Sequence, residues 1–298
     1  MAKRCVFVLL LGDAETGDVD HFQLLQQRTA LEEGNRLGFD VEVVPAPAFD
    51  QFRILKRRLL DGEAPPLAAV VTEPGSTSAL ELMMNELRGK VGLIILSAWG
   101  PAFERAATTW GPGLPIGAVG TNHIQVGEIQ ARQVRLLLPE RGRVLYVAGP
   151  LRSLAAQQRL EGLKKELGPD IPLMETSAGR WIVADGAVAF NDWYRVAKAR
   201  DPVVHVVAAG SDELAMGARE ACEALAQPQH REALLTAKFL GVDACPTYGA
   251  KLVAEGQLAG SVLTPANTGL ALAHLQRFFD EGVPVPALSF TEAQPFSR

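Results

Sequence analysis

The stretch VVHVVAAGSDELAMGAREACEAL, residues 203–225, decides the fold of this chain. Its apolar first part, residues 203–209, ends at Gly210-Ser211-Asp212, and a helical pattern follows. A short apolar run that stops at glycine and a capping residue predicts a buried parallel strand leading into a helix. Ligands of parallel sheets bind beyond the carboxyl ends of the strands. Ser211 or Asp212 can cap this helix, and Asp212 is a candidate cap, a candidate ligand contact, or both.

The same order of strand and then helix recurs along all 298 residues. This alternation predicts an α/β fold of parallel, doubly wound sheets, and the number of expected strands exceeds what one such sheet usually holds. We therefore expect two sheets, with the segment 97–113 left irregular. The expected strands are residues 6–11, 40–44, 67–72, 91–96, 115–119, 144–148, 171–175, 203–209, 239–242, 260–263 and 288–290.

Composition excludes several classes of protein. The net charge of −5 is inconsistent with a nucleic-acid footprint, which needs a clustered basic face. Cys5, Cys222 and Cys245 are odd in number and lack zinc spacing, which favours a reducing compartment. No apolar run approaches the roughly 20 residues of a membrane span, so we expect no membrane insertion. The apolar run after Lys3-Arg4 lacks a cleavage site and is interpreted as the first strand rather than a leader.

The motifs of common catalytic and cofactor sites are missing from the sequence. It has no glycine-rich nucleotide fingerprint, no G-x-S-x-G elbow and no H-E-x-x-H pair. Its five histidines show no ligand spacing. We therefore expect no cofactor, no metal and no catalytic residue, although fold alone does not exclude an enzyme.

Polar and aromatic residues instead recur where the expected strands end. Carboxylates and amides hydrogen-bond hydroxyl groups, while flat aromatic rings cover the apolar faces of sugars. A cleft with convergent polar groups and aromatic walls is typical of a small-molecule site. The residues at these strand ends are Asp20, His21, Phe22, Trp99, Asn122, His123, Trp181, Asp212, Asp243 and Thr264.

Five segments carry a resemblance to a known family. They are VGTNHIQVG (residues 119–127), AAQQRLEGL (155–163), VVAAGSDELAMGA (206–218), LGVD (240–243) and LAGSVLT (258–264). In order and spacing they are similar to the SDN-x-x-x-G, A-x-x-R-x-x-G, ND-x-x-A-x-G, G-x-D and L-x-x-T-V-x-Q patterns of type I periplasmic binding proteins of the ribose and galactose subgroup.

The resemblance implies two α/β lobes of periplasmic-binding-protein-like I type, joined by three hinge crossovers and closing on a sugar. By position, the N-terminal lobe comprises residues 1–121 plus 265–285. The C-terminal lobe comprises residues 122–264 plus 286–298. The crossovers are expected near residues 121–122, 264–265 and 285–286.

The resemblance also implies ligand contacts by position. Asp243 matches the family's hydroxyl-accepting aspartate, whereas Arg159 matches an arginine that supports a loop. Asn122 and His123 are interpreted as hinge and cap residues. The usual Asp-Arg pair near residues 97–99 is absent, which removes charged groups that bind a pentose in this family. We therefore expect a ligand other than ribose. The predicted ligand-binding residues are His21, Phe22, Trp99, Gln157 (in place of an arginine), Trp181, Ser211 (in place of an asparagine), Asp212, Asp243 and Thr264 (in place of a glutamine).

Two functions remain open at this point. The first is a solute-binding protein that captures a monosaccharide or sugar-like molecule for an ABC permease or a sensor protein. The alternative is the ligand-sensing core of a lac-repressor-like regulator, whose DNA-binding domain would need about 60 residues before the first strand. The family resemblance implies a periplasmic location if a leader has been removed, and the chain as given implies a cytoplasmic one.

Overall fold

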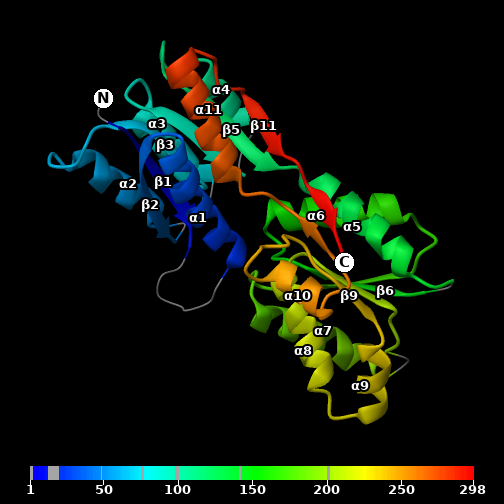
Figure 1. Ribbon diagram of the computed structural model, residues 1–298. Helices are drawn as coiled ribbons and strands as arrows, with labels where there is room; N and C mark the ends of the chain where they lie inside the picture. The colour runs from blue at the N-terminus through cyan, green and yellow to red at the C-terminus, as the bar shows by residue number, and fades with distance from the viewer. Residues whose placement is uncertain are drawn as a thin grey trace. The chain divides into compact units, whose positions relative to one another are not determined.

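The computed structural model describes residues 3–12, 20–47, 49–74, 77–97, 101–140, 142–199 and 202–298. The chain divides into two compact units. Unit 1 comprises Met1–Thr121 and Ala266–Thr291, and unit 2 comprises Asn122–Pro265 and Glu292–Arg298 (Figure 1). Both units contain parallel sheets, which confirms the predicted fold class.

Unit 1 is built on a six-stranded sheet with the strand order β11-β5-β4-β3-β1-β2. Each described pairing in this sheet is parallel. The elements of unit 1 are β1 (Arg4–Leu11), α1 (His21–Arg36), β2 (Phe39–Ala46), α2 (Gln51–Leu60), β3 (Leu67–Thr72), α3 (Thr77–Leu87), β4 (Gly92–Leu96), α4 (Pro101–Ala107), β5 (Ile116–Thr121), α11 (Asn267–Glu281) and β11 (Leu288–Thr291).

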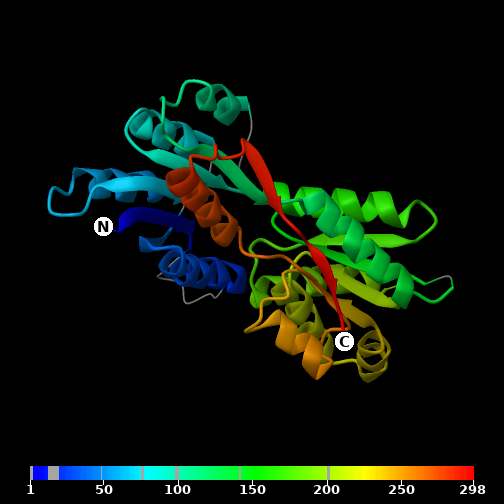
Figure 2. The ribbon, with the colours of Figure 1, turned by 45° about the horizontal axis from the view of Figure 1, so that its top comes forward.

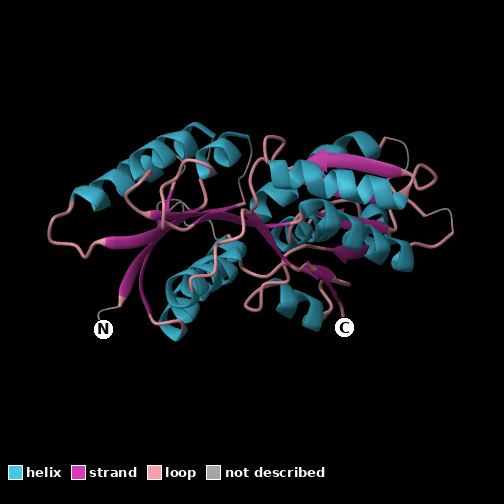
Figure 3. Cartoon of the chain, turned by 90° about the horizontal axis from the view of Figure 1, so that it is seen from above, coloured by secondary structure: helices cyan, strands magenta, loops and turns pink. Residues whose placement is uncertain are grey.

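Helices cover both faces of the sheet in unit 1 (Figure 3). Along β1, Val6 and Val8 face a core that α1 and α11 complete. Phe7 and Leu9 face the opposite core, which α2, α3 and α4 complete. Side chains of a strand alternate between its two faces, so a strand covered on both sides must be apolar throughout. This requirement explains the unbroken apolar run that predicted the first strand.

Unit 2 is built on a four-stranded parallel sheet with the order β7-β6-β8-β9. A short antiparallel pair, β10 with β12, lies in the same unit. The elements of unit 2 are α5 (His123–Leu137), β6 (Val144–Ala148), α6 (Leu154–Leu167), β7 (Leu173–Ser177), α7 (Val183–Ala197), β8 (Val206–Ala209), α8 (Asp212–Glu223), α9 (Pro228–Leu235), β9 (Lys238–Leu240), α10 (Gly249–Glu255), β10 (Ser261–Leu263) and β12 (Gln294–Phe296).

The helices of unit 2 also pack in two layers. α5 and α6 lie side by side (Figure 2) and cover one face of the sheet. α7 and α8 pack together on the other face. Two glycines allow the close approach of α5 and α6, because a Cβ at Gly127 would lie 2.0 Å from Arg159 O and one at Gly162 would lie 2.0 Å from Ile124 O. This contact brings the N-terminal turns of both helices to the carboxyl end of the sheet.

Both sheets have a topological switch point, where the chain reverses its direction of travel across the sheet. It lies between β1 and β3 in unit 1 and between β6 and β8 in unit 2. The helices that follow the two strands at such a point cover opposite faces of the sheet and leave a crevice beyond the strand ends. Each unit therefore has one place where its topology favours ligand binding.

The last segment of the chain differs from the expected division. We assigned residues 286–298 to the second lobe, but β11 pairs with β5 from Leu288↔Ala118 to Thr291↔Thr121. Its backbone groups complete the hydrogen-bonding edge of β5, so residues 288–291 belong to unit 1 (Figure 1). The chain returns to unit 2 only after Thr291.

Three elements were missed by the sequence analysis. The segment 97–113 was expected to be irregular, but it contains α4. No range was predicted for α9, although His230 was placed on a helix, and β12 was not expected. α9 begins with Pro228 in its first turn, where proline is well tolerated because its missing N–H has no intrahelical partner. No described helix is long and apolar enough to cross a membrane.

A buried polar network joins the ends of three chain segments in unit 1. Asn267 Oδ1 accepts hydrogen bonds from Thr121 Oγ1 (3.3 Å) and Thr291 Oγ1 (3.1 Å). Its Nδ2 donates to Ser97 Oγ at 3.2 Å. Thr121 and Thr291 are the last residues of unit 1 before two passages into unit 2, and Asn267 lies one residue after the return from Pro265 to Ala266. One amide therefore fixes the unit 1 ends of the three passages.

We predict that Asn267→Ala lowers the free energy of unfolding by about 1–3 kcal/mol, because it removes the acceptor that two buried threonine hydroxyls share and leaves them only weaker contacts with each other and with Gly120 O. Urea unfolding of the full chain measures this change. Asn35→Ala removes an asparagine that is exposed on α1 and is expected to change stability by less than about 0.5 kcal/mol. Equal stability of the two variants would contradict a structural role for the network.

Candidate functional site

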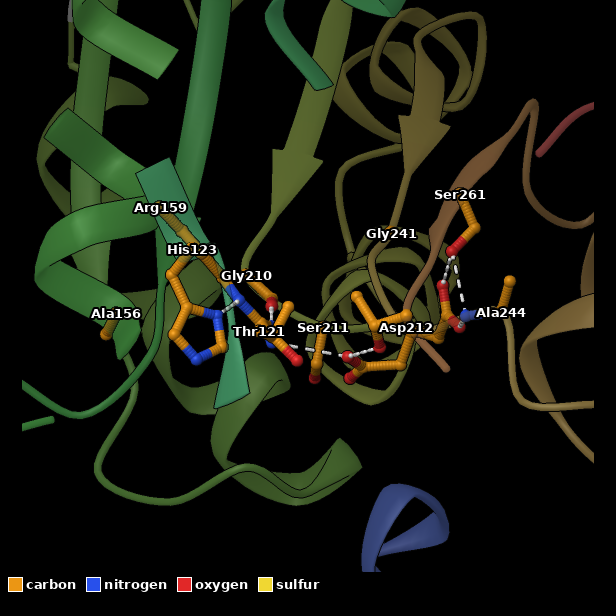
Figure 4. Close-up of polar contacts among 12 residues, drawn as sticks. Thr121, His123, Ala156, Arg159, Gly210, Ser211, Asp212, Gly241, Ala244 and Ser261 are labelled. Atoms are coloured by element: carbon orange, nitrogen blue, oxygen red, sulfur yellow. Dashed lines mark hydrogen bonds and ion pairs between the residues drawn. The ribbon is translucent and has the colours of Figure 1, made fainter. Parts of the chain in front are cut away.

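A buried arginine forms hydrogen bonds with the residues that follow two strands of unit 2. Arg159, on α6, is 6% exposed. Its Nη1 donates to the Gly210 carbonyl and its Nη2 donates to Asp243 Oδ1 at 3.3 Å. Its Nε donates to His123 Nδ1 at 3.3 Å (Figure 4). The rigid five-donor fork of a guanidinium suits this task, since it reaches three acceptors in different directions at once.

Asp243 follows β9 and is 6% exposed. Burial raises the pKa of its carboxyl group, and the Arg159 charge opposes that rise. Thr264 Oγ1 donates to the same oxygen that binds Arg159, Oδ1, at 3.0 Å. Within the described residues, each hydrogen bond of this carboxylate ends on Oδ1. Oδ2 is therefore left as an acceptor for a ligand hydroxyl.

Trp181 lies over the switch point of unit 2. A Cβ at Gly149, after β6, would approach its ring to 2.1 Å, and one at Gly210, after β8, would approach it to 3.0 Å. Only glycine allows the ring to rest on these two strand ends. The Arg159 guanidinium lies 5.4 Å from the indole centroid, within cation–π range. The indole also packs on the core between the sheet, α7 and α8, so it contributes to packing as well as to the site.

His123 acts as an acceptor in this cluster. Burial lowers the pKa of its imidazole well below the usual value, and the Arg159 charge lowers it further. Its Nδ1 accepts from Arg159, so the neutral ring must carry its proton on Nε2. Asn122 caps the same helix, because its side chain accepts from the Gln125 N–H at 3.1 Å. Both residues support the site by ordering the first turn of α5.

The carboxylate of Asp212 is buried, and both of its oxygens accept hydrogen bonds from groups of unit 2. The residue is 1% exposed, and its carboxylate accepts from Ala244 N and from Ser261 Oγ, each at 2.7 Å (Figure 4). Burial, and then the charge of Asp243, raise its pKa well above the usual value. Ala244 and Asp243 have positive φ angles of 45° and 104°. Asp212 therefore holds a strained turn that presents Asp243.

Three further predicted contacts have partners within unit 2. Ser211 is the N-cap of α8, since its side chain accepts from Leu214 N at 3.2 Å. Thr264 is fully buried and donates to Asp243, so it orients that carboxylate. Gln157 is exposed on α6, and its Nε2 donates to Leu151 O at 2.7 Å. A direct ligand contact of these side chains stays a prediction.

In unit 1 the structure reveals a candidate that the sequence analysis missed, Glu73. It follows β3, and its backbone N–H donates to Leu9 O in β1 at 3.0 Å, which places it at the switch point. Gln23 Nε2 donates to Glu73 Oε2 at 2.8 Å. Burial raises the pKa of the carboxyl group to about 6, although hydrogen bonds from Gln23 and the Leu11 backbone lower it. From the sequence alone, Glu73-Pro74-Gly75 is interpreted only as a turn.

The predicted aromatic residues of unit 1 lie near the same strand ends. His21 and Phe22 are in the first turn of α1, where Asp20 caps the helix by accepting from Gln23 N at 3.1 Å. Both side chains are partly exposed. Trp99 lies outside the described residues. Contacts of these three side chains with a ligand stay predictions.

Comparison with known proteins gives the family. Residues 67–271 match the periplasmic binding protein domain. A candidate rhizopine-binding protein of Rhizobium meliloti is 27% identical over 110 residues, which cover 36% of this chain and 34% of that protein. The match thus spans about a third of that relative.

Solved structures share the fold at low sequence identity. A solute-binding protein of an ABC transporter from Actinobacillus succinogenes with bound D-allose is 17% identical, with a TM-score of 0.79 over 99% of this chain and 98% of that chain. A solute-binding protein from Bacillus halodurans with bound myo-inositol is 20% identical, with a TM-score of 0.75 over 99% and 94%. The sequence match over residues 67–271 covers well over half of the chain. The chain therefore belongs to the periplasmic binding protein family, as its motifs predicted.

Proposed function

We propose that this chain binds a small polyhydroxylated ligand, a sugar or a cyclitol, reversibly and without making or breaking a bond. One observation carries the proposal: Arg159 contacts both Trp181, which lies on the glycines at the switch point of unit 2, and Asp243, which keeps an oxygen that no described residue uses. An aromatic face and a fixed acceptor are the two features that recognition of a ring with hydroxyl groups needs. The ligands named for the structural relatives, D-allose and myo-inositol, have this chemistry.

The two units supply different parts of the recognition. In unit 2, the strand ends and the helix that carries Arg159 are tied together by buried hydrogen bonds, so this half is arranged before a ligand arrives. In unit 1, Glu73 offers an additional acceptor. We propose that hinge motion at the three passages allows ligand capture, and that His21, Phe22 and Trp99 are ligand contacts in unit 1.

The role of the chain follows from its family. Members of the family are substrate-binding proteins that serve ABC systems in the periplasm. We propose the same compartment here, with an ABC permease or a sensor protein as the partner. The described structure holds no group of three or more His, Cys, Asp or Glu side chains placed to bind a metal.

A thermal-shift screen over monosaccharides, disaccharides, polyols and nucleosides tests the proposal. A ligand present at about 100 times its dissociation constant adds about 2.7 kcal/mol to the stability of the folded chain. We expect a neutral or amino-substituted sugar or cyclitol among the hits. Stabilisation by nucleosides alone would refute binding of a sugar or cyclitol.

We predict that Trp181→Ala weakens binding of a hit by at least about tenfold, because burial of an aromatic face against a ligand is worth about 1.5–3 kcal/mol. Isothermal titration of the folded variant measures this loss. The matched control is Trp193→Ala, which removes a partly buried indole that packs on Phe190 in α7. The proposed site is wrong if both variants bind the hit as tightly as the parent chain.

We predict that Arg159→Met lowers the free energy of unfolding by about 3–5 kcal/mol at neutral pH, because it leaves the buried Asp243 carboxylate without its counter-charge. Arg159→Met combined with Asp243→Asn should lose less than the single arginine variant. Urea unfolding of both variants gives this comparison. Arg132→Met, which removes an exposed arginine paired with Glu166 across 3.3 Å, should cost no more than about 1 kcal/mol.

A further inference from the structure

Glu73 is the carboxylate at the switch point of unit 1. Its side chain has two protein partners, Gln23 Nε2 and the Leu11 backbone N–H. Among the described residues, no lysine, arginine or histidine pairs with it. The other residues between 1 and 121, namely 1–2, 13–19, 48, 75–76 and 98–100, contain no basic residue.

The position of this carboxylate is fixed from three sides. Gln51, a fully buried residue of α2, donates from Nε2 to the Glu73 carbonyl oxygen at 2.9 Å. The Glu73 N–H donates to Leu9 O in β1. Gln23 holds the carboxylate itself from α1. The charge is therefore held at the strand ends and is partly exposed there.

The Glu73 carboxylate acts as a hydrogen-bond acceptor toward the side-chain amide of Gln23. Its NH₂ group points at Glu73, and its own oxygen, Oε1, is buried with no hydrogen-bond partner among the described residues. A carboxylate offers about four lone-pair positions, and the protein fills two of them. The remaining positions call for a donor, and an uncompensated negative charge favours a positively charged donor.

In unit 2, unlike Glu73 in unit 1, the strand-end carboxylate of Asp243 has a positively charged partner. Asp243 is paired with Arg159 across 3.3 Å, and both side chains are less than a tenth exposed. That pair is neutral as a whole, so it selects for hydroxyl groups and not for charge. Gln157, an exposed residue on α6, adds no charge to this half. Asp212 also lacks a counter-charge within the described part of the chain, but both of its oxygens accept hydrogen bonds within unit 2, from Ser261 Oγ and from Ala244 N. Glu73 combines the lack of a paired positive charge with acceptor positions that no described residue fills.

We propose that Glu73 makes the site selective for a ligand that carries a protonated amino group, such as an amino sugar or an aminocyclitol. The inference rests on the function proposed above and names the class of ligand. The ammonium group binds the free positions of the Glu73 carboxylate. The raised pKa of Glu73 agrees with a carboxylate that has no counter-charge in the empty protein.

Matched pairs of ligands test this selectivity with the full chain: D-glucosamine against D-glucose, D-galactosamine against D-galactose, and an aminocyclitol against myo-inositol. We expect the amino member of at least one pair to bind about tenfold or more tightly than its neutral partner, as for a charge-assisted hydrogen bond. The affinity of that ligand should rise about tenfold from pH ~5 to pH ~7, because Glu73 ionises over this range. Isothermal titration at low salt measures both effects.

Glu73→Gln is the decisive variant, since it keeps the shape and removes the charge. It should abolish the preference for the amino ligand and its pH dependence, while binding of the neutral partner is retained. Glu81→Gln, which removes an exposed carboxylate from α3, should behave as the parent chain.

Three outcomes overturn the proposal. If neutral sugars bind as tightly as their amino partners, or if Glu73→Gln keeps the preference, the charge selectivity is wrong and the proposed function stands. If no sugar, cyclitol or amino derivative binds, the proposed function fails together with this inference.

Discussion

The buried guanidinium of Arg159 is the constraint on which the candidate site of unit 2 depends. It joins α6 to the loop after β8, to Asp243 after β9 and to the first turn of α5. A carboxylate taken out of water without a counter-charge costs several kcal/mol, so the arginine stabilises the turn that presents Asp243. A lysine would replace it poorly, because its three N–H donors radiate from one nitrogen, whereas Arg159 donates to its three acceptors from three separate nitrogens.

The first unit has the same succession of strands at its switch point but holds its strand ends with neutral groups. Asn267 binds Thr121, Thr291 and Ser97 through one amide, and none of these side chains carries a charge. Such a network fixes the backbone without creating an electric field in the site. The field in this unit comes instead from Glu73, which is positioned by two glutamines and has no counter-charge. Two halves of similar topology therefore differ in electrostatics.

Periodicity predicted most of the strands and helices, because each sheet is covered on both faces and its strands must be apolar throughout. It could not decide between Ser211 and Asp212 as the cap of α8, since both side chains can accept from a helix N–H. Ser211 takes that role, and Asp212 instead reaches Ser261, 49 residues away. Glu73 was missed for a similar reason. Its neighbours Leu9 and Gln23 are distant in sequence, and only the pairing of β1 with β3 brings them together.

The unpaired carboxylate also has a thermodynamic consequence for the empty protein. Burial raises the pKa of Glu73 from 4.5 to about 6, so the folded chain binds a proton there more readily than the unfolded chain. Stability from this group therefore falls as the pH rises between these two values, and at neutral pH the fold carries the cost of an ionised, unpaired acid. A packing role would be served better by glutamine or by a nonpolar residue. A charged group that lowers the stability of its own fold is typical of a site shaped for something that the protein must bind.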